Sequence, residues 1–155
     1  MGWGRRVGWG ALAALAVAQL VPVERTNPPV DAEVAVADPE VRTLLRTACW
    51  DCHSHETVWP WYAWVAPVSW LATHDVDHAR RELDFSRFES YEPTKQRKKL
   101  GELAEEVDEH EMPLWYYVPM HPEARLSDDE RERIVSWAAA ERIRRGGGPS
   151  KPAAP

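Results

Sequence analysis

Apolar residues recur at helical spacing in four parts of the chain, and proline-rich segments separate these parts. Side chains three or four positions apart share one helix face, so we expect helices over residues 39–48, 67–83, 94–109 and 127–145. No segment alternates apolar and polar residues as a half-buried strand would, so the pattern predicts an all-α fold. The residues expected to face inward are Val41, Leu44, Leu45, Ala48, Val68, Leu71, Val76, Ala79, Leu100, Leu103, Ala104, Val107, Ile134, Val135, Trp137, Ala138 and Ile143.

Two of these helices have clear start signals. Asp38 precedes Pro39, which suits an N-cap followed by the first helical position. Ser127 is followed three residues later by Glu130, the pattern of a capping box. The segments 84–96 and 111–127 are expected to be loops, and Leu45 and Trp137 are expected near the crossing of the first and last of the four helices.

The N-terminal segment is more uniformly apolar than any other. Arg5 and Arg6 precede an apolar run over residues 7–23, which is typical of an export signal. Residues 1–23 are therefore expected to be either a signal peptide, cleaved after the small residues Ala16 and Ala18, or a retained signal-anchor helix. Both alternatives place the remainder in the periplasm or on the outer face of the cytoplasmic membrane.

Length and charge indicate how the rest of the chain is organised. The chain has 155 residues and a formal net charge of −6, which indicates one domain and gives no basic face for nucleic acid. We expect a linker over residues 24–37, one domain over 38–145, and a disordered tail over 146–155.

The chain's two cysteines lie together in the sequence CWDCH, as Cys49 and Cys52, followed by His53. C-x-x-C-H is the signature of covalent haem attachment. On one helical turn both thiols project to the same side, where they reach the two vinyl groups of one porphyrin, and His53 points at the iron. The pattern therefore favours one haem c.

Three other interpretations of CWDCH remain open. A thioredoxin-like redox pair needs a preceding strand, and none is visible. A zinc site would use Cys49, Cys52, His53 and His55, but a second ligand pair is missing. A disulfide would close a very small loop and contribute little stability. If His55 is not a ligand, we expect it on the surface.

A porphyrin also needs an apolar, aromatic surrounding. The stretch after CWDCH supplies one in Trp59, Trp61, Tyr62 and Trp70, which are expected to bind the cofactor. In so small a domain, the core and the haem pocket would form one cluster.

A haem that transfers electrons usually has a second axial ligand, and methionine opposite histidine raises its potential. Met112 is the leading candidate, because the chain between it and His53 is long enough to wrap round the haem. Met120 is an alternative in the same loop. The histidine alternatives are His74 and His78, four positions apart on one helix, and the loop residues His110 and His121.

These motifs together resemble the haem-binding domain family of bacterial exported c-type cytochromes. The matching stretches are CWDCHSHETVWPWYAWVAPVSWL, HDVDHARRELDFSRF and EMPLWYYVPMHPEARLSDDER. The resemblance implies a cytochrome-c-like helical fold with covalent haem. It also implies that Cys49 and Cys52 are the thioether anchors, His53 the proximal ligand and Met112 the distal one.

The sequence thus predicts a single-electron carrier that meets an unidentified redox partner at the membrane. The alternative is a haem-based sensor or a peroxidase-like enzyme with an open or displaceable sixth position, in which His110 or Arg125 would act on a bound small molecule.

Overall fold

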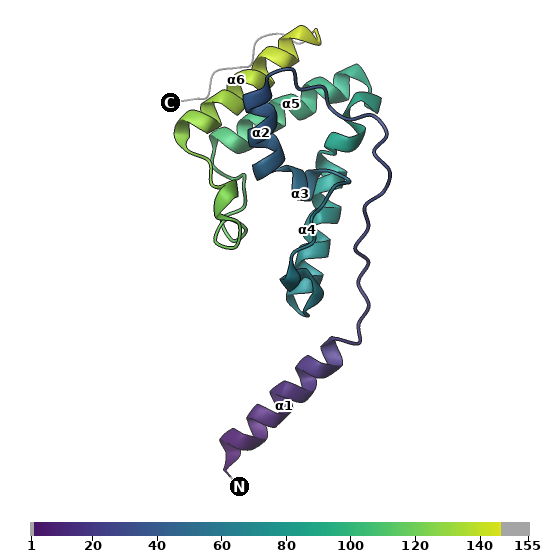
Figure 1. The fold of residues 1–155 in the computed structure, drawn as a ribbon, viewed down its shortest axis with the longest axis vertical. Helices are drawn as coiled ribbons and strands as arrows, with labels where there is room; N and C mark the ends of the chain where they lie inside the picture. The colour runs from purple at the N-terminus through teal and green to yellow at the C-terminus, as the bar shows by residue number, and fades with distance from the viewer. Residues whose placement is uncertain (1, 147–155) are drawn as a thin grey trace.

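A computed structural model describes residues 2–146, and this part of the chain is helical and contains no strand. Figure 1 shows one helix standing apart and the others gathered into a single body. The α-helices are α1 Trp3–Ala18, α2 Pro39–Ala48, α3 Trp50–His53, α4 Val68–Glu82, α5 Pro93–Asp108 and α6 Asp128–Arg144. Three 3₁₀ helices, η1 Trp61–Trp64, η2 Phe85–Ser90 and η3 Pro122–Ala124, lie in the connections. The all-α prediction is confirmed.

The four expected helices form within a residue of their predicted ends. Asp38 caps α2 by accepting hydrogen bonds from the backbone N–H groups of Glu40 and Val41. Ser127 and Glu130 form the reciprocal capping box at the start of α6. The prediction of a plain loop over 84–96 is wrong, because Asp84 caps η2 through the backbone N–H of Ser86 and α5 already begins at Pro93.

The core lies where α2 packs against the pair formed by α5 and α6, which run side by side in Figure 1. Leu45, Leu100, Val107 and Ile134 are almost fully inaccessible to solvent. Trp137 is partly buried against the same cluster, and α2 contacts α6. The predicted crossing of these helices near Leu45 and Trp137 stays a prediction. This core supports the helices that surround the CWDCH motif.

Three of the residues expected to face inward are exposed. The buried face at the start of α4 is formed by Ser69 and Thr73, and the Thr73 hydroxyl donates to the Ser69 carbonyl, so Val68 and Leu71 point outward. At the end of α6, Glu141 holds the inward position, and Ile143 lies roughly 200° round the helix from it. In both places, polar residues that form local hydrogen bonds or ion pairs occupy the buried positions of the helix, and the apolar residues lie on the exposed side.

Helix α1 buries none of its residues, and its large apolar side chains, including Trp3, Trp9 and Leu12, are exposed. None of the helices in residues 2–146 has the length and apolar character needed to cross a membrane. The expected tail over 146–155 lies outside the described residues, apart from Gly146.

The segment between α1 and α2 has no regular structure, yet it is bound to the domain. We call residues 24–37 the strap, and Figure 1 shows it running from the α1 side of the molecule to the start of α2. Val34 and Val36 are buried in the core, and the backbone N–H of Val34 donates to the Phe85 carbonyl at 2.8 Å. The sequence predicted a linker here, and the structure adds that this linker covers one side of the CWDCH motif.

Candidate functional site

The CWDCH motif forms one helical turn directly after α2. The backbone N–H groups of Cys52 and His53 both donate to the Cys49 carbonyl, at 3.3 and 3.0 Å. This turn brings Cys49, Cys52 and His53 to the wall of a single cavity of about 600 Å³. Ligand pockets in proteins span roughly 300–1,000 Å³, so the cavity is large enough for a cofactor.

The other walls of this cavity, which we call the main cavity, come from α4, α5 and the loop after α5. Met112 lines it, together with Leu103 and Val107 of α5 and the aromatic residues Phe85 and Tyr117. Its lining is mainly apolar. The structure therefore brings four of the predicted site residues, from two distant parts of the chain, around one apolar space.

The loop that carries Met112 is tied to the helices at both sides. The backbone N–H of Met112 donates to the Glu106 carbonyl at 3.0 Å. Arg131 of α6 donates through Nη1 to the carbonyl oxygens of Met112, at 2.6 Å, and Val107, at 3.0 Å. These bonds hold the backbone of Met112 in place, so its side chain is presented to the cavity from a fixed position.

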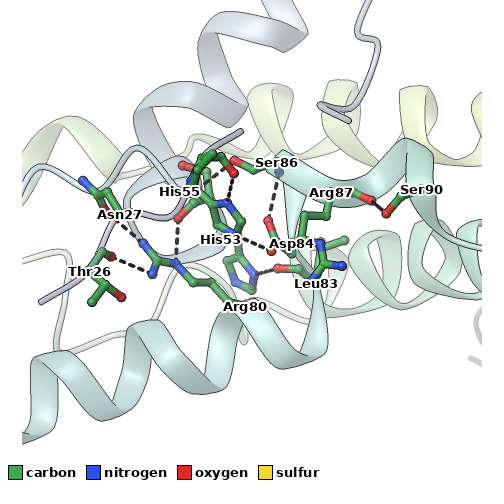
Figure 2. A network of polar contacts seen from close by, with 12 residues as sticks. Thr26, Asn27, His53, His55, Arg80, Leu83, Asp84, Ser86, Arg87 and Ser90 are labelled. Atoms are coloured by element: carbon green, nitrogen blue, oxygen red, sulfur yellow. Dashed lines mark hydrogen bonds and ion pairs between the residues drawn. The ribbon is translucent and has the colours of Figure 1, made fainter. Parts of the chain in front are cut away.

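His53 is oriented by the backbone of the segment after α4. Its Nδ1 lies 2.9 Å from the Leu83 carbonyl oxygen, as Figure 2 shows. A carbonyl only accepts, so Nδ1 carries the proton and Nε2 keeps its lone pair. Burial lowers the pKa of His53, which favours the neutral imidazole. An imidazole held in this tautomer is ready to bind a metal through Nε2.

The two thiols have the opposite character to redox-active cysteines. Cys49 and Cys52 are free and half-buried, and burial raises the pKa of each to about 12. Thiols used in disulfide exchange have a lowered pKa, because the thiolate is the reacting form. The surroundings of the pair therefore do not favour the thioredoxin-like alternative.

His55 is buried, and the expectation that it lies on the surface is wrong. Its Nδ1 is 2.8 Å from the Pro29 carbonyl oxygen in the strap, and its Nε2 is 2.8 Å from Asp84 Oδ2. Both ring nitrogens are thus occupied, which leaves none for the zinc site considered from the sequence. Among residues 2–146, no three His, Cys, Asp or Glu side chains are grouped so that they could hold a metal ion.

Arg80 of α4 fastens the strap over this side of the motif. Figure 2 shows its guanidinium beside Thr26 and Asn27, where it donates to the Thr26 carbonyl oxygen at 2.8 Å and to Asn27 Oδ1 at 3.0 Å. It donates to the Ser54 carbonyl oxygen at 2.8 Å as well. It also donates to the Thr57 hydroxyl at 2.9 Å. On the strap side of the motif, the polar side chains of His55 and Arg80 are hydrogen-bonded to other protein groups. On the other side, Cys49, Cys52 and His53 line the main cavity, where they can bind a ligand.

The aromatic residues predicted to bind the cofactor lie mostly beside a second, smaller cavity of about 420 Å³. Trp59, Trp61 and Tyr62 line this second cavity, which shares Cys52 and Tyr117 with the main one. Trp70 lines neither cavity and is 38% exposed. Three of the four aromatic residues are therefore next to the Cys52 end of the main cavity rather than around its centre.

Among the alternative ligands and acid–base residues, His78 lines the main cavity, as His53 and Met112 do. His74 is exposed and stacks on His78 with ring centroids 6.1 Å apart. Neither His110 nor Arg125 lines either of the two cavities, and both are exposed. Met120 and His121 line the second cavity, where His121 Nε2 meets the Tyr62 hydroxyl at 2.5 Å.

Sequence reasoning missed three contributors to the main cavity. Phe85 and Tyr117 supply its aromatic walls, and the Leu83 carbonyl orients His53. Tyr117 follows Met112 in the same loop, a proximity that could have drawn attention to it. No sequence signal marks Leu83, because it acts through its backbone.

The comparisons with known proteins agree with this site. The model of the haem-binding domain family matches residues 13–140, which is more than half of the chain and includes all the residues that line the main cavity. No curated protein matches the chain, and no solved structure does. A haem-binding site is thus indicated by the family match as well as by the cavity, and the chain belongs to the haem-binding domain family.

Proposed function

We propose that this protein is a c-type cytochrome that carries single electrons on the outer side of the membrane. The observation that supports this most strongly is the convergence of Cys49, Cys52, His53 and Met112 on one apolar cavity of about 600 Å³. Haem held there by two thioether bonds would have an axial ligand available from each of two chain segments. Bound haem supplies an iron that alternates between the ferrous and ferric states.

The attachment turn positions the cofactor. Cys49 and Cys52 would bond the two vinyl groups, and His53 would bind the iron through Nε2 as proximal ligand. The hydrogen bond from His53 Nδ1 to the Leu83 carbonyl fixes the ring plane and increases the donor strength of Nε2. Trp59, Trp61 and Tyr62 would shield the haem edge at Cys52 from water. Trp70 has no such place, and its role in the pocket remains a prediction.

Met112 completes the proposed coordination as the distal ligand. Its thioether sulfur is a soft donor, and its backbone is held by Arg131 and Glu106. An iron with two protein ligands has no open position for a substrate, which suits electron transfer better than sensing or peroxidase chemistry. The contact between α2 and α6 supports a cytochrome-c-like arrangement of the domain.

We also propose that residues 1–23 direct export, with Arg5 and Arg6 remaining on the cytoplasmic side until the chain is inserted. The carrier would then work in the periplasm or on the outer face of the cytoplasmic membrane, where it would meet a membrane redox partner. The N-terminal mass of the exported protein distinguishes a cleaved signal peptide from a retained segment.

The test of histidine–methionine ligation is a comparison of Met112→Ala with Met120→Ala. Both residues lie in the same loop, but only Met112 lines the main cavity. We expect Met112→Ala to abolish the weak long-wavelength band of sulfur-ligated ferric haem and to make the ferrous protein bind carbon monoxide. Met120→Ala should retain the spectrum of the unsubstituted protein. Optical spectra of the purified holoproteins provide the measurement.

Two results would reject this assignment of Met112. One is a Met112→Ala protein whose low-spin spectrum is unchanged, and the other is an unsubstituted protein that already binds carbon monoxide readily. The second result would favour the sensor or enzyme alternative.

A further inference from the structure

The segment after the haem-attachment turn has an unusual surface. Residues 58–73, which we call the uncharged segment, contain no charged side chain. They form η1 and the first turns of α4, which pack against each other. Seven large apolar side chains of this segment are between 38% and 74% exposed: Val58, Trp61, Trp64, Val65, Val68, Trp70 and Leu71. Exposed apolar groups of this extent are rare on monomeric proteins unless another surface covers them.

The uncharged segment lies next to the end of α1. The Gln19 side chain, directly after α1, accepts from the Ala66 N–H at 3.0 Å and donates to the Ala66 carbonyl at 3.2 Å. Gln19 also donates to the Leu15 carbonyl at 2.9 Å, which ties the last turn of α1 into the same contact. Figure 1 shows α1 ending close to the lower end of α4. A surface that covers the apolar side chains at this end of α1 must therefore also contact the uncharged segment around Ala66.

The composition of this surface matches a lipid interface better than a protein partner. Tryptophan is enriched where bilayers meet water, because one part of its ring is apolar and the other donates a hydrogen bond. The Arg25 guanidinium lies 4.0 Å from the centroid of the Trp64 ring, which places a positive charge at the border of the apolar surface. An apolar surface bordered by arginine fits acyl chains and anionic headgroups.

We propose that the uncharged segment rests on the lipid bilayer, with Trp61, Trp64 and Val65 in contact with lipid. This extends the proposed role at the membrane exterior and names the surface that faces the membrane. Trp61 and Cys52 both line the second cavity, so lipid contact by the uncharged segment would keep the Cys52 side of the main cavity close to the bilayer. A carrier held in this orientation would present its cofactor to membrane redox partners without free tumbling.

The test uses the full-length holoprotein and vesicles of phosphatidylethanolamine and phosphatidylglycerol. Hydrogen–deuterium exchange with and without vesicles should show slower exchange over residues 61–72, in addition to any change in α1. Val65→Asp should remove this protection and weaken partitioning into the vesicles roughly tenfold, because a carboxylate at a lipid-facing position is costly. Val65 lines neither cavity, so haem attachment should be unaffected.

Ile143→Asp is the matched control. Ile143 is 52% exposed and Val65 is 45% exposed, but Ile143 lies on α6, at the opposite end of the molecule from α1. This variant should partition like the unsubstituted protein. Protection confined to α1 would overturn the proposal, as would equal effects of the two substitutions. Protection that appears without vesicles and increases with protein concentration would indicate a second copy of the chain instead. The haem content of the same samples reports separately on the proposed function.

Discussion

His53 and His55 are separated by one residue, yet they lie on opposite sides of the CWDCH turn and differ in whether a ring nitrogen is left without a protein partner. On the strap side, both ring nitrogens of His55 have acceptors, Pro29 and Asp84, and the ring is buried. On the cavity side, His53 forms a hydrogen bond through Nδ1, and among the hydrogen bonds of residues 2–146 no protein group donates to the lone pair of its Nε2.

The difference shows how a structural histidine can be distinguished from a ligand. A buried polar group normally finds partners within the protein, and His55 follows this rule. A ligand-binding group must keep one donor or acceptor in reserve, next to a space that the ligand can fill. His53, Cys49, Cys52 and Met112 meet this requirement, because all four line the main cavity.

The largest effect that separates the two sides is expected from His53→Ala. This substitution removes the proposed proximal ligand, so the yield of haem-containing protein should fall to the level of a strain without the gene. Haem content per polypeptide, measured on the exported protein, checks the prediction. Full haem occupancy with an unchanged spectrum would exclude His53 as a ligand.

His55→Ala is the matched control and is expected to keep its haem. It leaves the Pro29 carbonyl and one oxygen of the buried Asp84 without their histidine partner, which should cost about 3 kcal/mol of unfolding free energy. Chemical denaturation of the holoprotein measures this cost. If the His55→Ala protein is fully folded but lacks haem, then His55 is needed for haem binding and does not differ from His53 in the proposed way.

A smaller effect concerns the pH dependence of the strap. The Glu89 carboxylate accepts hydrogen bonds from Arg145 and from the Ala35 backbone N–H, and the Arg145 bond in particular lowers the pKa of Glu89. A lowered pKa stabilises the fold above the ordinary glutamate value of about 4.3, and this contribution is lost as the pH falls through the lower pKa of the folded state.

The protection factors of residues 31–36 in hydrogen exchange, which compare each rate with the intrinsic rate at the same pH, should therefore fall on acidification below about pH 4. Glu89→Gln should lower these protection factors already at neutral pH and reduce their dependence on pH. Glu105→Gln, at an exposed position of α5, should behave like the unsubstituted protein. Equal exchange rates in both variants across the acid range would show that Glu89 does not hold the strap.

Local patterns in the sequence predicted the four long helices of the domain well. The starts of α2 and α6 follow from Asp38, Pro39, Ser127 and Glu130, whose capping interactions lie within three residues. The C-x-x-C-H spacing places Cys49, Cys52 and His53 on a single helical turn, and all three line the main cavity. Met112 could be proposed because only a soft donor at a suitable distance along the chain was needed.

Long-range contacts decided what the sequence could not predict. His55 is buried because the strap, 26 residues away at Pro29, folds over it. Val68 and Leu71 are exposed because Ser69 and Thr73 take the inward positions of α4, where a pattern of apolar residues predicted the reverse. The Leu83 carbonyl has no sequence signature, although it orients His53.

The most direct test of the central claim is the intact mass of the protein after export from a host that attaches haem to C-x-x-C-H motifs. The account predicts the polypeptide mass plus one haem, retained after denaturation and acid extraction, and the bare polypeptide mass for the Cys49→Ser, Cys52→Ser double variant. A folded, unsubstituted protein that shows only the polypeptide mass would contradict covalent attachment, and with it the proposed cytochrome.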